Sequence, residues 1–310
     1  MGEFMKEAYN RQVGLLLDVL PIVAKSNVFA LKGGTAINFF FRDCPRLSVD
    51  IDLHYLPLNS WEEALTDIRD HMGMIKSGIE KSMPDAKVMI DSATCNAQVE
   101  YHNARIKIEP NTVIRGTLLS PVEMPLCSSL AKEFNREMSI TCVAKVELYA
   151  GKLCAALQRQ HPRDLFDMRL FLTKDEGLTR NFLDVFIIYL ISQGKPIHEM
   201  LSPNMHDITH LYHNQFQGMA TSDVSLERLC EVQATLSGNI LDILTDQDRE
   251  FLIGFKNKKP DWSLMRYQNA KELPAVRWKQ FNLDKMDAKK HQLAVDKLAE
   301  VLGINPPTSG

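Results

Sequence analysis

The chain has 310 residues, of which 45% are hydrophobic and 24% are charged, and its formal net charge is −3. A chain of this length and composition can bury a substantial core and is expected to form two domains. It contains no run of about 18 apolar residues and no zones of a signal peptide, which argues against a membrane partner and predicts a cytoplasmic protein.

The first part of the chain predicts a mixture of helices and strands. Residues 6–24 carry apolar side chains at helical spacing and lead into a β-branched and aromatic run at 28–31. The pair Gly33-Gly34 then precedes a short apolar helix at 35–41. The elements expected next are a strand at 49–55, an amphipathic helix at 61–83 and short strands at 87–90, 97–101, 105–108 and 112–115.

The second part of the chain is almost entirely helical in pattern. Helices are predicted at 142–160, 163–172, 180–192, 225–236, 246–255 and 286–302. The proline-containing stretch Leu119–Pro125 separates the two patterns and is the expected hinge. We expect the native start at Met5, because Met1–Phe4 resembles a cloning remnant, and therefore predict domains at 5–125 and 126–305.

Two carboxylates are placed together by the strand expected at 49–55. Residues two apart in a strand point to the same side, so Asp50 and Asp52 present their side chains together. Two adjacent negative charges are reasonable if a divalent cation binds there, and such oxygen ligands suit Mg²⁺ or Mn²⁺. Glu109, which closes a neighbouring predicted strand, is the expected third metal ligand. It could instead accept a proton from an attacking hydroxyl.

The residues around this pair indicate phosphate chemistry. Glycines between a strand and a helix let the backbone approach an anion, so Gly33, Gly34 and Thr35 are expected to bind a nucleotide. Arg46 and Ser48 precede the carboxylate strand and could hold its phosphate or sugar, although Ser48 could equally cap a turn. Each feature alone fits an ordinary turn or surface. Their order within one strand, Gly-Gly, helix, strand unit favours a phosphoryl-transfer site.

Four separated blocks resemble the AbiEii-type nucleotidyltransferase toxins, polymerase-β-like enzymes that include the MenT toxins. The blocks are Leu31–Ala36, Arg46–Leu53, Glu147–Leu153 and Arg163–Met168, with a looser similarity at Pro274–Lys279. The resemblance implies an α+β fold. In it, an N-terminal polymerase-β-like nucleotidyltransferase α/β domain and a C-terminal all-helical domain make a bilobed molecule.

The resemblance also implies roles for particular residues. Asp50 and Asp52 would bind metal, Lys152 would contact the triphosphate, Asp164 would support catalysis and Arg163 would bind the nucleotide. It further implies a cognate antitoxin. Independently of the resemblance, Lys152 lies among small and apolar residues, where a charge is expected to face a cleft. Asp164 opens a predicted helix and could merely cap it, and Asp167 could act beside it.

The family resemblance predicts transfer of a nucleoside monophosphate from an NTP to an RNA acceptor, expected to be the tRNA 3′ end, by a two-metal mechanism. Two alternatives stay open: transfer to a protein hydroxyl, and a non-catalytic nucleotide-binding interaction module. On the catalytic interpretations, replacing Asp52 or Lys152 with alanine is expected to abolish transfer without affecting folding.

A basic and aromatic segment near the C-terminal end offers a possible RNA contact. Residues 256–290 carry ten Lys and Arg against four Asp and Glu. Four aromatic residues are interleaved with them, namely Trp262, Tyr267, Trp278 and Phe281. These rings could stack on exposed bases, or they could fill the core of the helical domain.

Overall fold

The computed structural model describes residues 3–174 and 177–304, and these residues form two compact units. The first, here called the sheet unit, contains the described residues up to 148 together with 218–223. The second, the helical unit, contains those between 149 and 217 and from 224 onward. The chain therefore returns briefly to the sheet unit after the helical unit has begun.

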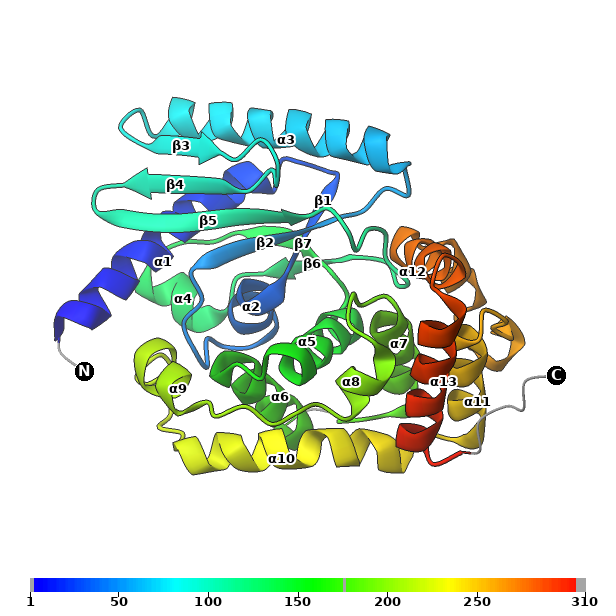
Figure 1. Cartoon of the computed structure of the whole chain (residues 1–310). Helices are drawn as coiled ribbons and strands as arrows, with labels where there is room; N and C mark the ends of the chain where they lie inside the picture. Colours follow the sequence, from blue (N-terminus) through cyan, green and yellow to red (C-terminus); the bar gives the residue numbers. More distant parts are fainter. Residues whose placement is uncertain (1–2, 175–176, 305–310) are drawn as a thin grey trace. The chain divides into compact units, whose positions relative to one another are not determined.

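The sheet unit is organised around one seven-stranded mixed sheet (Figure 1). Its strands are β1 (Phe29–Lys32), β2 (Asp50–Tyr55), β3 (Lys87–Ile90), β4 (Ala97–Tyr101), β5 (Ala104–Asn111), β6 (Val122–Pro125) and β7 (Ser139–Cys142). Their order is β3-β4-β5-β2-β1-β7-β6. The pairs β2–β5 and β1–β7 are parallel and the other neighbours are antiparallel. The strands that carry the predicted carboxylates, β2 and β5, are thus direct neighbours.

Helices α1 (Glu3–Val23) and α3 (Trp61–Ser82) pack against the sheet and against each other. Helix α3 begins at a capping box, in which the Ser60 hydroxyl accepts from the backbone N–H of Glu63 and the Glu63 carboxylate accepts from that of Ser60. The sheet unit also contains α2 (Gly33–Ala36), the π-helical turn Ile37–Phe41 and α4 (Ser128–Glu133). The amphipathic pattern of the first two long helices therefore supplies the cover for one face of the sheet.

Three predictions for segments near the middle of the chain differ from the structure. Residues 112–115 are not a strand, because the Asn111 side chain accepts hydrogen bonds from the backbone of Val113 and Ile114 and turns the chain. The helix expected from Cys142 begins at Lys145, since Cys142 ends β7. The expected hinge Leu119–Pro125 contains β6, so the sheet unit extends beyond residue 125.

The segment before β6 is held by a buried acid from one of the family-like blocks. Glu147 is 1% exposed, and its carboxylate accepts hydrogen bonds from the backbone N–H groups of Leu118 and Leu119, both at 3.0 Å. Two backbone donors satisfy the hydrogen-bonding capacity of a carboxylate that has no access to water. The block Glu147–Leu153 therefore includes a residue whose role is structural.

The helical unit contains the remaining helices. They are α6 (Pro162–Lys174), α7 (Arg180–Ile191), α8 (Ile197–Leu201), α9 (Thr209–Gln215), α10 (Leu226–Ile243), α11 (Asp246–Lys256), α12 (Pro274–Asp284), α13 (Ala288–Leu302) and two 3₁₀ turns (Trp262–Leu264 and Gln268–Glu272), with most of α5 (Lys145–Arg159). Helix α7 is buried from Phe182 to Ile191 and forms the centre. The predicted α+β class, with a helical C-terminal part, is confirmed.

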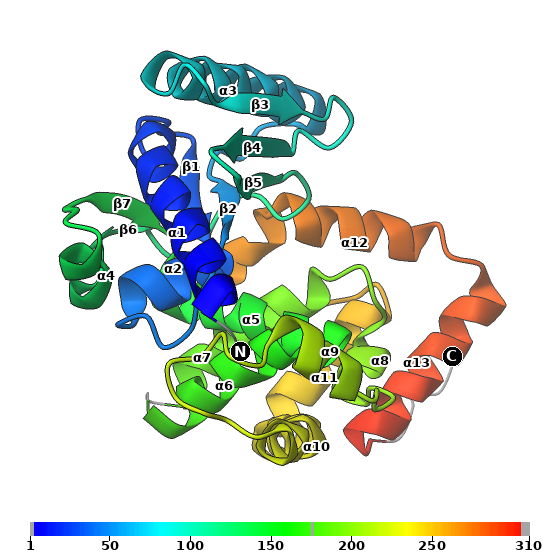
Figure 2. The ribbon, with the colours of Figure 1, turned by 90° about the vertical axis from the view of Figure 1, so that its left-hand side faces the viewer.

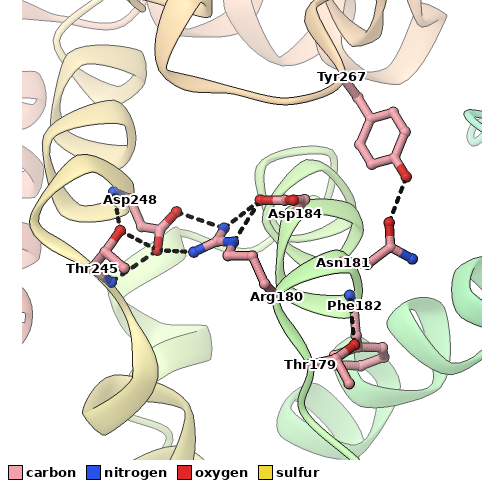
Figure 3. A network of polar contacts seen from close by, with 8 residues as sticks. All are labelled: Thr179, Arg180, Asn181, Phe182, Asp184, Thr245, Asp248 and Tyr267. Atoms are coloured by element: carbon pink, nitrogen blue, oxygen red, sulfur yellow. Dashed lines mark hydrogen bonds and ion pairs between the residues drawn. The ribbon is translucent and has the colours of Figure 1, made fainter. Parts of the chain in front are cut away.

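Polar contacts fix the start of α7 to α11 (Figure 3). The Arg180 guanidinium donates to Asp184 one turn later and to Asp248 on α11, with a 2.7 Å contact to Asp248 Oδ2. The hydrogen bond to Asp248 raises the pKa of Arg180 above its ordinary value. Asp248 also caps its own helix through Thr245. This network is structural, since one guanidinium joins carboxylates of α7 and α11 through charge-assisted hydrogen bonds.

Among residues 3–174 and 177–304, no helix combines the length and apolar character that a membrane crossing requires.

Candidate active site

Strand β2 separates an apolar face from a polar one. Ile51, Leu53 and Tyr55 are fully buried, and the Tyr55 hydroxyl donates to Asp67 of α3 at 2.6 Å. Because side chains alternate along a strand, Asp50 and Asp52 lie on the face opposite to α3, and both are partly exposed. The alternation predicted from the sequence thus places both carboxylates on the polar face.

The strand register sets charged residues side by side on this polar face. Asp52 is the register partner of Lys32 on β1 and of Glu109 on β5. Asp50 is the partner of Lys107, whose ammonium lies 4.0 Å from the Glu109 carboxylate. Register partners in neighbouring strands have adjacent side chains. Asp52 and Glu109 are therefore adjacent carboxylates, with Lys32 beside them.

A cavity of about 380 Å³ opens at this position. Its lining includes Lys32, Asp52 and Glu109. The rest comes from the turn after β3 and from the end of β5 and the residue that follows it, namely Ala93, Thr94, Asn96, Pro110, Asn111 and Thr112. The sequence did not single out Lys32, although it precedes Gly33 directly in the first family-like block. Thr94, Asn96 and Asn111 were also missed, since their approach depends on strand order and no local motif marks it.

Gly33 is required by its contact with Asp52. Its φ of +72° lies in the left-handed region, and a Cβ atom there would come within 2.0 Å of Asp52 Oδ2. A Cβ on Gly34 would lie 2.8 Å from Arg46 Nη2 and 2.9 Å from Ser48 Oγ. Both glycines therefore allow close approach, and the groups that approach are the protein's own side chains.

The other residues expected to bind nucleotide are buried against each other. Thr35, Arg46 and Ser48 are 0%, 2% and 7% exposed. The Thr35 hydroxyl donates to the Asp50 carbonyl oxygen at 2.5 Å and lies 3.0 Å from the Ser48 hydroxyl. These contacts fix the backbone where β2 begins, so the three side chains shape the carboxylate strand.

A short segment, residues 218–221, clamps the loop that carries Arg46; we call it the strap. Leu47 N–H donates to the Met219 carbonyl and Thr221 N–H donates to the Pro45 carbonyl, both at 2.9 Å. Arg46 and Ala220 form an antiparallel bridge. The strap lies about 170 residues after the Arg46 loop in the sequence. Gly218, with a φ of +80°, is the local feature that marks its turn. Sequence reasoning did not find it.

His54 continues the polar side of β2 into the interior. It is 1% exposed, and its Nε2 lies 2.6 Å from the Gly116 carbonyl oxygen, so that nitrogen carries the proton. Burial, with the positive charge of Lys32, lowers the pKa of His54 to about 4. The side chain is neutral at pH 7 and lies two residues after Asp52 on the same side of β2.

The metal set expected from the sequence was Asp50, Asp52 and Glu109. Across residues 3–174 and 177–304, no three His, Cys, Asp or Glu side chains are gathered as a preformed metal site. The adjacent pair Asp52 and Glu109 with nearby Asp50 still fits Mg²⁺, which takes one or two protein carboxylates and completes its shell with water and phosphate oxygens.

In the helical unit, Lys152 is held in a buried ion cluster. Its ammonium lies 2.9 Å from Asp164 Oδ1 and 3.1 Å from Asp167 Oδ2. The side chains of Lys152, Asp164 and Asp167 are 8%, 4% and 0% exposed. The more exposed Arg159 binds the second oxygen of Asp164 at 2.9 Å. Two cations thus balance two carboxylates, and Asp164 is bound to side chains of α5.

Aromatic packing positions this cluster. Tyr149 on α5 stacks on Phe171 of α6 with ring centroids 4.4 Å apart, and Phe171 contacts Phe182 of α7 at 4.8 Å. A Cβ on Gly151 would lie 3.4 Å from the Tyr189 ring, so this glycine lets α5 approach α7 closely. The rigid packing of three helices therefore sets the place of Lys152.

Arg163, the remaining predicted site residue, lies on the first turn of α6 and is half-buried. Its backbone N–H donates to His161 Nδ1 at 3.1 Å, and the other ring nitrogen of His161 lies 3.1 Å from Gln215 Oε1. These contacts fix the entry to α6.

The comparisons with known proteins agree with this geometry. A family described as the nucleotidyl transferase AbiEii toxin of type IV toxin-antitoxin systems matches residues 14–280. The chain belongs to the AbiEii nucleotidyltransferase toxin family. The resemblance drawn from the four sequence blocks is confirmed, and the match extends through Pro274–Lys279. No curated protein matches the chain.

A solved structure supports the same fold. MenT4, a nucleotidyltransferase toxin from Mycobacterium tuberculosis H37Rv, superposes with a TM-score of 0.54 at 14% identity, covering 93% of each chain. At this identity the likeness shows the fold. With the family match, this AbiEii protein is a nucleotidyltransferase of a toxin family.

Proposed function

We propose that this AbiEii toxin transfers a nucleoside monophosphate from an NTP to an RNA acceptor, and that the acceptor is the 3′ end of tRNA. The observation that carries the proposal is the in-register pair Asp52 and Glu109, which lines a cavity beside Lys32 on the polar face of the sheet. Adjacent carboxylates with a nearby cation suit the binding and displacement of phosphates.

In the proposed reaction, a ribose hydroxyl of the acceptor attacks the α-phosphorus of the NTP. The new oxygen–phosphorus bond forms as the bond to the β-phosphate bridging oxygen breaks, and pyrophosphate leaves. Glu109 accepts the hydroxyl proton, since its side chain is 37% exposed and adjacent to Asp52. Lys32 attracts the negative phosphates.

Asp50, Asp52 and Glu109 are the residues that would hold a divalent metal. When bound, Mg²⁺ or Mn²⁺ supplies neutralisation of the phosphate charge, and two such ions are the form expected for this reaction class. Thr35, Ser48 and Arg46 support the carboxylates through the backbone at Asp50 and the loop before it. We thus assign them a positioning role next to the nucleotide.

The family also implies that Lys152 contacts the triphosphate, that Asp164 supports catalysis and that a cognate antitoxin binds the toxin. We retain these roles as proposals. In the helical unit, the Lys152 ammonium forms ion pairs with Asp164 and Asp167. A phosphate that binds Lys152 therefore competes with two carboxylates.

The test is incubation of the protein with total RNA, Mg²⁺ and each of the four α-labelled NTPs in turn. We expect one NTP to label a tRNA-sized RNA band, which RNase removes and Asp52→Asn protein does not produce. Label in a protein band that survives RNase would replace the RNA acceptor with a protein hydroxyl. Absence of label from every band, with a folded protein, would contradict the proposal.

A further inference from the structure

Helix α12 presents two aromatic rings to the outside of the helical unit. Trp278 and Phe281 are 59% and 45% exposed, whereas Val276 and Leu283 on the same helix are buried. Residues three and four apart lie on the same face of a helix, so Trp278, Phe281 and Lys285 form one outward stripe. We call these three residues the α12 stripe. Figure 2 shows α12 leading into α13.

The two rings of the α12 stripe stack on each other. Their centroids are 5.6 Å apart and their planes differ by 26°, and the Lys285 ammonium lies 4.0 Å from the centre of the Phe281 ring. Isolated exposed apolar side chains are common, but a stacked exposed pair with a cation above it is a surface that favours a planar ligand.

The other two aromatic residues of the basic segment point inward. Trp262 packs edge-on against Phe251 at 5.1 Å, and the Tyr267 hydroxyl donates to Asn181. The two interpretations left open by the sequence therefore divide between the rings: Trp262 and Tyr267 fill the helical unit, and the α12 stripe remains on the surface.

Positive charge surrounds the α12 stripe. Residues 277–290 contain five Lys and Arg against two Asp. The Lys279 ammonium is occupied by hydrogen bonds within the protein. It donates to the backbone carbonyls of residues 193, 194 and 195 at 2.6, 3.2 and 3.0 Å. Arg277 pairs with Glu272 at 2.8 Å in a solvent-exposed contact. The exposed Lys285, Lys289 and Lys290 are the cations best suited to bind an added anion.

We propose that the α12 stripe binds unpaired bases of the RNA acceptor, with Trp278 and Phe281 stacking on the bases and the lysines binding the adjoining phosphates. The inference rests on the proposed function, because it assigns a contact to the acceptor named there. Stacking on aromatic rings accepts any base, and a basic surround binds the backbone. A protein partner fits less well, since the core of a protein interface is depleted in charged residues.

The experiment measures binding of a fluorescein-labelled single-stranded RNA of 12 nucleotides to Asp52→Asn protein without NTP, by anisotropy. Asp52→Asn is used because it prevents transfer during the titration. Adding Trp278→Ala and Phe281→Ala together is expected to weaken binding by about tenfold to a hundredfold. Trp278→Phe, which retains a ring, should remain within about threefold of its parent. Lys285→Gln should reduce the dependence of binding on salt.

Leu293→Ala is the matched control, because Leu293 is 56% exposed on α13 and has no aromatic ring; it should bind as its parent does. A blunt-ended RNA duplex of the same length should bind more weakly than the single strand and lose little in the double variant. Equal RNA binding by the double variant and its parent would overturn the inference. The inference would also be overturned if the double variant bound RNA as its parent does but no longer bound the antitoxin.

This experiment separates the inference from the proposed function. A second comparison uses Trp278→Ala/Phe281→Ala protein that keeps Asp52. If this protein labels RNA as well as wild type does, the inference about the α12 stripe fails and the proposed function stands. RNA binding could depend on the α12 stripe while the label is found only on protein. That result would support the stripe as an RNA-binding site and would contradict RNA as the acceptor.

Discussion

In the sheet unit, Asp52 and Glu109 lie on a partly exposed strand face, whereas in the helical unit Asp164 and Asp167 are buried around Lys152. The first pair has a cavity beside it that ligands can enter. The second is balanced by cations of the protein itself. Charges that face a cavity are available for a ligand, while charges paired in the interior cannot lose one partner without a loss of stability.

Residues from the same set of family motifs can therefore differ widely in how much their removal destabilises the protein. Removing a carboxylate from the strand face is expected to affect the reaction and leave the free energy of unfolding nearly unchanged. Removing Lys152 is expected to affect both, because Asp164 and Asp167 stay buried after losing a cation that contacts each of them. Four substitutions, ordered by their expected effect on the free energy of unfolding, test this contrast.

Lys152→Ala is expected to have the largest effect. It leaves the buried carboxylates of Asp164 and Asp167 without the cation they share, which costs about 3–5 kcal/mol. Urea unfolding followed by circular dichroism measures the loss. Arg159→Ala is the control, since the Arg159 side chain is 63% exposed and its loss should cost less than about 1 kcal/mol. If the Lys152→Ala protein is as stable as wild type, the expected difference in stability cost between the Lys152 cluster and the strand-face carboxylates does not exist.

His54, the buried residue on the polar side of β2, is expected to make the free energy of unfolding depend on pH. Its pKa is about 4 in the folded protein and about 6.5 in an unfolded chain, so the unfolded state binds the proton more readily. The corresponding stability is present above pH 6.5 and is lost as the pH falls towards 4, by roughly 3 kcal/mol.

Unfolding of wild type and His54→Gln across pH 4–7 measures this contribution. The variant should lack that part of the pH dependence, and a variant with the wild-type pH profile would show that another group causes it.

Gly33→Ala is expected to cost about 1–3 kcal/mol and to reduce transfer, because it combines a left-handed backbone with a Cβ directed at Asp52. Gly177→Ala is a matched control: Gly177 has a φ of +71° with nothing within 4 Å of the added atom. The control should lose stability through backbone strain and keep its transfer rate. Equal transfer rates in the two variants would show that the contact with Asp52 is unimportant.

Glu109→Gln is expected to have the smallest effect on folding, within about 0.5 kcal/mol, because its side chain is 37% exposed. If Glu109 accepts the proton of the attacking hydroxyl, transfer should fall by about 10²-fold or more. Initial rates with the labelled NTP measure this, with the thermal midpoint as the folding control. A wild-type rate would assign the proton to another group.

The sequence predicted the elements that local pattern determines. The alternation at Asp50–Asp52, the Gly33-Gly34 turn and the long amphipathic helices were found because periodicity and glycine chemistry are local signals. Lys32 and Asn111 were missed as cavity residues, since their place depends on the order of strands β1, β2 and β5. The strap at 218–221 was missed for the same reason.

Burial also changed what the sequence predicts for Lys152. Its surroundings of small and apolar residues suggested a charge facing a cleft, from which an alanine variant that folds normally was expected. The contacts with Asp164 and Asp167 come from a different helix, so spacing along α5 could not reveal them. The aromatic residues of the basic segment likewise required the fold before Trp262 could be separated from Trp278.

The carboxylates on the strand face are expected to be needed for nucleotide transfer and not for the stability of the fold. Asp52→Asn tests this claim most directly, because asparagine keeps the shape that Gly33 accommodates and removes the charge. We predict that transfer of the labelled nucleotide falls at least about 10³-fold, with the free energy of unfolding within about 0.5 kcal/mol of wild type. Transfer at the wild-type rate by folded Asp52→Asn protein would contradict the claim.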